Sequence, residues 1–232
     1  MTEAQLQAAV HTLYEGDTNT PEATSEDYLA RRGLLNAGIN IWENYGNTYW
    51  NELYKTSAAS TGGTLTTTAT TSAYDCPTNF LNVNGYLRII DAAGDATYYS
   101  QIQPNKVQLF DNQSSTPNYF YVTGSPSSGY SVNIHPTPTV SSLTIRYEYY
   151  ATSTSLSAIT SVPECSDPYF LVYFALSRMY HIDGLSGKAN EALGVAEGKL
   201  MAMRKRNGML SHYQSNSVVD LIFDQGVLGF GR

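Results

Sequence analysis

The feature that most constrains the fold is a helical pattern from Asp167 to Ile182 that is apolar on nearly every side. Its apolar residues follow one another almost without a break: Tyr169, Phe170, Leu171, Val172, Tyr173, Phe174, Leu176, Met179 and Tyr180. A helix of this kind is buried on more than one face. The chain must therefore supply other elements that cover it, and Gly184 fits a left-handed cap at its C-terminal end.

A second helical pattern, from Ser186 to Arg206, follows directly and is amphipathic. Its apolar stripe, at spacings of three and four, comprises Ala189, Leu193, Ala196, Leu200 and Met203. We expect Ser186 to cap this helix and Gly208 to end it. Gly194 and Gly198 lie one turn apart inside it. Two explanations for these glycines are open: another backbone approaches closely there, or they are tolerated on the surface of the helix.

Two further helical patterns begin the chain. Thr2 and Gln5 have the spacing of a capping box, and the short helix that they begin ends near Gly16. Thr24 and Asp27 repeat this spacing before a longer, heavily aromatic helix. Its three-and-four pattern consists of Tyr28, Leu35, Ile39, Trp42, Tyr45, Tyr49 and Leu53.

The middle of the chain has the composition of a β structure. Residues 56–72 are almost all Thr, Ser, Ala and Gly, which suits either a linker or an exposed β-ribbon. Short β-rich runs separated by Gly and Pro follow, at 86–90, 97–102, 107–110, 119–123, 130–134 and 143–150. In the last run, Ile145 and Tyr147 fall on one face, and Arg146 and Glu148 on the other. Regular short strands of this kind predict a small sandwich or barrel.

The order of these patterns predicts an α+β protein. The amphipathic helices on either side of the β module need partners, and they can cover one another. We therefore expect residues 1–55 and 161–212 to form one helical bundle, with an antiparallel β-sandwich or barrel module, residues 56–160, inserted into it. Residues 213–232 would form an extended C-terminal arm.

This arm is apolar and broken by glycines. Its apolar residues are Val218, Val219, Leu221, Ile222, Phe223, Val227, Leu228 and Phe230. An uncovered apolar segment is an aggregation hazard, so something must cover it. The cover is either the protein's own domain or a neighbouring subunit or ring, reached by strand addition or by exchange of the arm.

The composition excludes several classes of protein. The net charge of −7 argues against a nucleic-acid binder with a basic face, although a protein that surrounds DNA without gripping it remains allowed. Tyrosines number 19, against 13 lysines and arginines together, which suits stable contacts between proteins. The sequence has no membrane-spanning run and no secretory signal pattern. The two cysteines suit a reduced compartment, and a disulfide between them stays open.

No constellation of catalytic residues is visible. The four histidines lack metal-ligand spacing, and the sequence has neither a nucleophile elbow nor a phosphate loop. We therefore expect no enzyme activity, no metal and no cofactor. The basic triplet Arg204, Lys205 and Arg206 is either a solvated helix end or a contact with DNA phosphate or an acidic partner.

One segment carries a family resemblance. An apolar strand leads through Pro136 and Pro138 into the strand Leu143–Tyr147, and Pro163-Glu164 then precedes the buried helix. This order resembles the head–tail adaptor proteins of tailed bacteriophages, also called connector, gatekeeper or tail tubular proteins. The resemblance extends to the longer N-terminal helix, where Arg31-Arg32 precedes Leu34-Leu35-Asn36.

The resemblance implies a structural virion protein at the head–tail interface. Such proteins form a homo-oligomeric ring of about twelve copies. Heterologous contacts between neighbouring copies close into a ring when the rotation from one copy to the next permits it. The implied partners are the portal protein, a tail or nozzle protein, and double-stranded DNA that passes through the ring without sequence-specific binding. We expect contacts with the portal or between subunits from Arg204, Lys205, Arg206, Val218, Val219, Leu221, Ile222, Phe223, Leu228 and Phe230. The alternative is a β-sandwich module that binds glycans or a receptor, with tyrosines as stacking platforms.

Overall fold

The computed structural model describes residues 1–57, 64–110 and 117–215. The chain divides into two compact units. Met1–Glu52 and Ser153–Arg232 form the first, which we call the helical unit, and Leu53–Thr152 form the second, the β unit.

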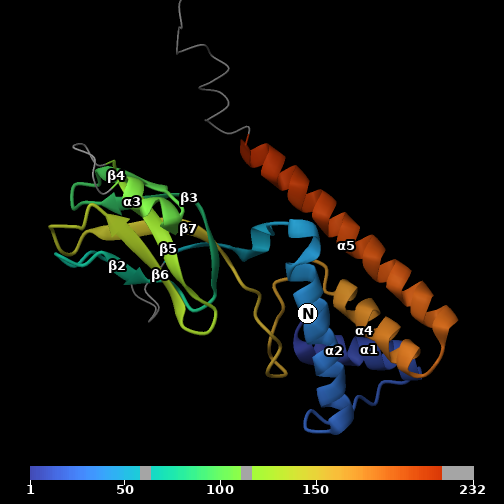
Figure 1. The fold of residues 1–232 in the computed structure, drawn as a ribbon. Helices are drawn as coiled ribbons and strands as arrows, with labels where there is room; N and C mark the ends of the chain where they lie inside the picture. Colours follow the sequence, from blue (N-terminus) through green and yellow to red (C-terminus); the bar gives the residue numbers. More distant parts are fainter. Residues whose placement is uncertain (58–63, 111–116, 216–232) are drawn as a thin grey trace, which may run out of the picture. The chain divides into compact units, whose positions relative to one another are not determined.

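The helical unit is built around the apolar C-terminal helix. Its α-helices are α1 (Glu3–Glu15), α2 (Glu26–Glu43), α4 (Tyr169–Ile182) and α5 (Ser186–Ser215). Helix α4 packs against α1, α2 and α5 (Figure 1). Seven of its residues are buried: Phe170, Leu171, Val172, Phe174, Ala175, Leu176 and Ser177. The expectation that the N- and C-terminal helices cover one another is therefore confirmed.

The two N-terminal helices begin through side-chain caps. In α1 the expected capping box is present, with the Thr2 backbone N–H donating to Gln5 Oε1 over 2.9 Å and Gly16 in the left-handed conformation at the C-terminal end. In α2 the cap is Ser25, not Thr24, because Ser25 Oγ accepts a hydrogen bond from the backbone N–H of Tyr28. The expected starting point was thus one residue early.

Helix α2 ends earlier than its aromatic periodicity predicts. The helix stops at Glu43, and two short 3₁₀ turns follow, η1 (Tyr45–Asn47) and η2 (Asn51–Leu53). Gly46 inside η1 has a φ of 57°, which breaks the helix. The aromatic residues beyond it still join the core, because Trp50 Nε1–H donates to the Trp42 carbonyl over 2.7 Å and the two indole rings lie 5.3 Å apart.

Helix α5 begins at Ser186 and is longer than expected. It contains Gly208 and continues to Ser215, 30 residues in all. Its buried stripe comprises Ala189, Ala192, Ala196, Leu200, Met203 and Asn207, while Leu193 is only partly covered. Gly194 and Gly198 lie on the exposed side, and within this chain nothing comes within 4 Å of the position of a Cβ atom at either residue.

Within the described residues, the β unit contains one curled sheet of seven strands. The strands are β1 (Tyr54–Thr56), β2 (Ala73–Asp75), β3 (Phe80–Ile90), β4 (Ala96–Gln101), β5 (Tyr119–Ser125), β6 (Gly129–His135) and β7 (Thr144–Ala151). Their order in the sheet is β1-β7-β3-β4-β5-β6-β2.

The sheet is mixed, so the expectation of an antiparallel sandwich or barrel is corrected. All pairs are antiparallel except β4 with β5, which is parallel. Parallel strands need a crossover connection. The described part of that connection contains the 3₁₀ turn η3 (Pro104–Lys106) and the short helix α3 (Val107–Phe110). The run 107–110, predicted as a strand, is therefore this helix.

The inner face of the sheet forms the core of the β unit. Strand β7 alternates as predicted, with Ile145, Tyr147, Tyr149 and Ala151 buried. They pack in one cluster with Phe80, Leu87, Phe120 and other buried residues. The described end of the Thr-rich stretch joins this structure: Thr67 N–H donates to the Leu143 carbonyl over 2.8 Å, and Thr67 is buried.

Candidate functional site

The described residues contain no group of three or more His, Cys, Asp or Glu that could hold a metal ion. Two of the histidines have structural partners. His11 is buried with Nε2 2.7 Å from Asp17 Oδ1, and its Nδ1 lies 2.9 Å from an Arg31 guanidinium nitrogen. Because a guanidinium only donates, Nδ1 accepts and Nε2–H donates. His135 stacks on Tyr119 with ring centroids 4.7 Å apart.

Both cysteines are free and buried, which closes the question of a disulfide between them. Cys76 belongs to the β unit and Cys165 to the helical unit. Burial raises the pKa of the Cys76 thiol to about 11 and that of the Cys165 thiol to about 12. Since the thiolate is the nucleophilic form, neither residue is poised for chemistry.

The basic triplet of α5 is exposed, and two of its members have contacts within the helical unit. The Arg204 guanidinium lies 5.8 Å from the centre of the Tyr45 ring, beside Gly46. An Arg206 guanidinium nitrogen donates to Ser166 Oγ over 3.4 Å. Lys205 is exposed between them. The triplet therefore presents its charge on the surface, while the side chains of Arg204 and Arg206 contact Tyr45 and Ser166.

The other predicted contact residues lie outside the described residues. They are Val218, Val219, Leu221, Ile222, Phe223, Leu228 and Phe230, all beyond Ser215. Their expected role in contacts with the portal or between subunits stays a prediction.

The helical unit carries an apolar groove of about 370 Å³ that the sequence alone did not reveal. We call it the α1–α4–α5 groove. It is lined by Leu13, Tyr173, Leu176, Tyr180, Lys188, Glu191, Ala192 and Val195. The groove exists only because three helices converge on it.

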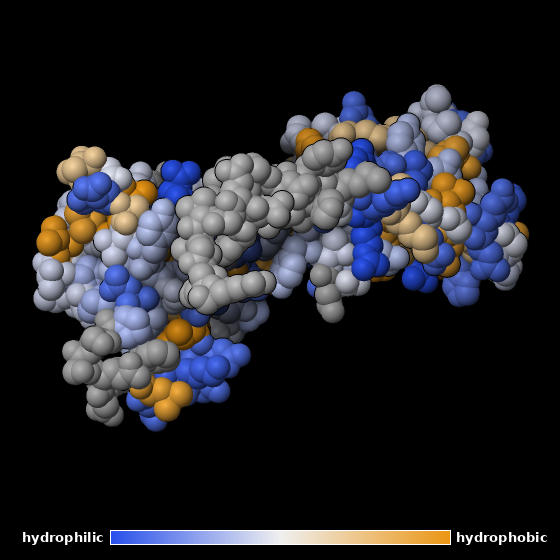
Figure 2. All heavy atoms as spheres, turned by 90° about the horizontal axis from the view of Figure 1, so that it is seen from above, coloured by the Kyte–Doolittle hydropathy of each residue, from blue (hydrophilic) through white to orange (hydrophobic). Residues whose placement is uncertain are grey.

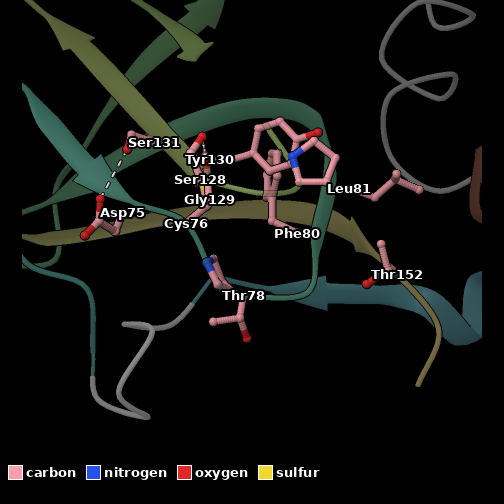
Figure 3. A pocket seen from close by; sticks show the side chains of 12 residues that line it. Asp75, Cys76, Thr78, Phe80, Leu81, Ser128, Gly129, Tyr130, Ser131 and Thr152 are labelled. Atoms are coloured by element: carbon pink, nitrogen blue, oxygen red, sulfur yellow. Dashed lines mark hydrogen bonds between the residues drawn. The ribbon is translucent and has the colours of Figure 1, made fainter. Parts of the chain in front are cut away.

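The β unit carries a second pocket, of about 450 Å³ (Figure 3). It lies where β2 meets β3 and the hairpin between β5 and β6. Its floor contains the rings of Phe80 and Tyr130, 5.4 Å apart, and on one side Ser131 Oγ–H donates to Asp75 Oδ1 over 3.1 Å. The pocket combines aromatic and polar surface, but within the described residues it holds no catalytic pair.

The surface is otherwise mixed. In the view of Figure 2, apolar side chains are scattered among polar ones. The large apolar side chains exposed on the helical unit include Leu13, Leu29, Ile41, Tyr169, Ile182, Leu185, Val195 and Met201. Such a surface offers several apolar contact points and little charge for binding a polyanion.

Among the described helices, none has the length and apolarity needed to cross a bilayer. None of the curated proteins compared with this sequence matches it significantly. The family model described as SU10 adaptor protein matches residues 1–218, nearly the whole chain. The helices, the β unit between them and this match agree with the expected head–tail adaptor resemblance, and the chain belongs to the SU10 adaptor protein family.

Proposed function

We propose that this protein is a head–tail adaptor of a tailed bacteriophage, a structural component without enzyme activity. The family match over residues 1–218 carries the proposal. The free, buried cysteines and the structural partners of His11 and His135 suit a protein whose role is assembly. The fold also favours an adaptor over a glycan-binding module, because the described helices α1, α2 and α5 pack on α4 in a unit of their own, which a free-standing β module does not need.

In the proposed assembly, about twelve copies form a ring between the portal and the tail or nozzle protein. Their helical units pack side by side. The exposed side of α5 supports this arrangement, since Gly194 and Gly198 leave room for a neighbour and Met201 exposes apolar surface. The ring surrounds the DNA exit channel of the virion.

The charge of the chain suits a DNA channel. With a net charge of −7, a ring of copies presents a wall that repels phosphate on average. Nonspecific DNA affinity comes largely from lysine and arginine contacts to phosphate. A wall poor in such contacts lets DNA pass during packaging and ejection without retaining it.

The contacts between subunits or with the portal are proposed to come from the C-terminal part of the chain. The exposed Lys205, with Arg204 and Arg206, supplies charge in the C-terminal half of α5, and residues 218–230 supply apolar surface. A contact of this kind combines an apolar core with a polar rim, as protein interfaces do.

Deletion of residues 218–232 tests this arrangement. We expect the truncated protein to keep its helical circular dichroism and its melting temperature, because the two cores lie within the described residues. It should lose binding to the portal, measured as co-sedimentation or as mass by light scattering. A matched control replaces Gln225 with Asn, which keeps the length, the charge and the apolar residues. Normal docking of the truncated protein would contradict the role of the arm.

A further inference from the structure

The α1–α4–α5 groove is a preformed surface. One of its lining side chains, Tyr180, has three contacts within the helical unit. Tyr180 O–H donates to the Leu13 carbonyl over 3.3 Å, its ring lies 5.3 Å from the Tyr14 ring, and the Lys188 ammonium lies 5.5 Å from its centre. Tyr14 in turn donates to an Asp183 carboxylate oxygen. Because these side chains are already held in place, a ligand that binds the groove loses little free energy in ordering them, which favours binding.

The groove is also apolar and open in a single chain. Leu13 and Val195, which line the groove from α1 and α5, are 45% and 39% exposed. Leu176 is buried, and Lys188 and Glu191 are the charged residues of the lining. Covering such surface gains roughly 25 cal/mol for each Å² of apolar area removed from water. The groove therefore fits a short apolar segment with a charged residue beside it.

The chain itself contains a segment with this chemistry. Residues 218–223 read Val-Val-Asp-Leu-Ile-Phe, and Asp224 follows. Five of the six residues are apolar and can fill the groove, while Asp220 and Asp224 can face the Lys188 ammonium. The charge on the segment is thus complementary to a cation already positioned on the groove.

The length of the chain decides which copy can supply this segment. Val195 lies 20 residues before Ser215 on α5, about 30 Å along the helix axis at 1.5 Å per residue. Leu221 lies only six residues beyond Ser215, and six fully extended residues reach at most about 22 Å. The segment cannot return to the groove of its own chain, so its donor must be a second copy.

We propose that residues 218–223 of one copy occupy the α1–α4–α5 groove of the adjacent copy. This inference rests on the proposed adaptor function and names the contact that joins the ring. The groove lies near the N-terminal end of α5 and the segment follows its C-terminal end, so the contact is heterologous, as ring closure requires. Each copy inserts its own segment into one neighbour and binds the segment of the other neighbour. The last contact that closes the ring then forms within one assembled complex, which makes it effectively intramolecular.

Disulfide trapping between two different variants tests the contact. Full-length Val195→Cys and full-length Leu221→Cys proteins are mixed, assembled on the portal and oxidised. We expect a covalent dimer on a non-reducing gel that neither variant forms alone. The native Cys76 and Cys165 are buried, so we expect them to form no cross-link. Wild-type protein, oxidised in the same way, serves as the control for this. The matched control is Glu197→Cys, an exposed position two residues further along α5 and so on the other side of the helix.

The outcomes separate this inference from the proposed function. Assembly on the portal, followed by trapping with Val195→Cys and not with Glu197→Cys, supports the exchanged arm. Assembly without trapping, or equal trapping at both positions, overturns the exchanged arm and leaves the adaptor function standing. Failure of the wild-type protein to increase the mass of the portal in light scattering overturns the adaptor function, and the inference with it.

Discussion

Burial decides the chemistry of the two cysteines. Cys165 is 3% exposed, and its sulfur lies 3.5 Å from the Met203 sulfur. Desolvation is the main cause that raises its pKa, and the nearby Asp167 carboxylate adds to it. A residue type often associated with catalysis is here an apolar core residue, which agrees with a structural protein.

The raised pKa makes stability fall in alkaline solution. The Cys165 pKa rises from 9.0 to about 12 on folding, so between these values the unfolded chain loses a proton that the folded chain keeps. Its contribution is complete below pH 9.0 and is lost as pH rises towards about 12. We expect Cys165→Ala to show a shallower decline in the free energy of unfolding over this range, measured by urea denaturation. Equal slopes for variant and wild type would contradict this.

At the scale of elements, the contact between α2 and α4 depends on one glycine. A Cβ atom at Gly38 would lie 3.1 Å from Leu171 Cδ2 and 3.1 Å from Phe174 Cδ1, both in the core. Gly33, on the same helix, faces open space. The two glycines thus have equal helix propensity and opposite packing environments.

This contrast predicts different effects of the same substitution. Gly33→Ala should stabilise the protein by about 0.5–1 kcal/mol, because alanine has the higher helix propensity. Gly38→Ala gains the same propensity but crowds two core side chains, so its melting temperature should lie below that of Gly33→Ala. Thermal denaturation of both variants measures the difference. A Gly38→Ala protein as stable as Gly33→Ala would show that α2 and α4 can separate without cost.

At the scale of the whole molecule, the β unit begins and ends at adjacent strands. Tyr54 on β1 pairs with Tyr150 on β7, so the two connections to the helical unit leave from one place. The β unit has its own core on the inner face of the sheet. An insertion of this kind can be removed without cutting a strand pair, because domain boundaries fall where few contacts cross.

The excised β unit should therefore fold alone. We expect residues 53–152, produced as a separate chain, to give a dispersed amide spectrum by NMR and a cooperative thermal transition. Ile145→Ala, which removes a side chain that is 1% exposed, should lower the stability of this fragment by about 2–5 kcal/mol. The exposed Ile159, in the helical unit, is the control in the full chain, where Ile159→Ala should have little effect. A fragment without a cooperative transition would show that the β unit depends on the helices.

The sequence by itself determined the features that depend on local patterns. The capping box at Thr2, the buried stripe of α5 and the alternation of β7 were readable, because they follow from the periods of helix and strand. The family resemblance rested instead on the order of Pro136, Pro138 and Pro163-Glu164 around apolar segments, which is similar to that of the head–tail adaptors.

Only the tertiary structure decided the features that join distant segments. The parallel pairing of β4 with β5 and the α1–α4–α5 groove each depend on contacts between residues far apart in the chain. Periodicity shows which face of an element is apolar but not which neighbour covers it. The groove is the clearest case, because its lining comes from three helices and its open surface is what their packing leaves uncovered.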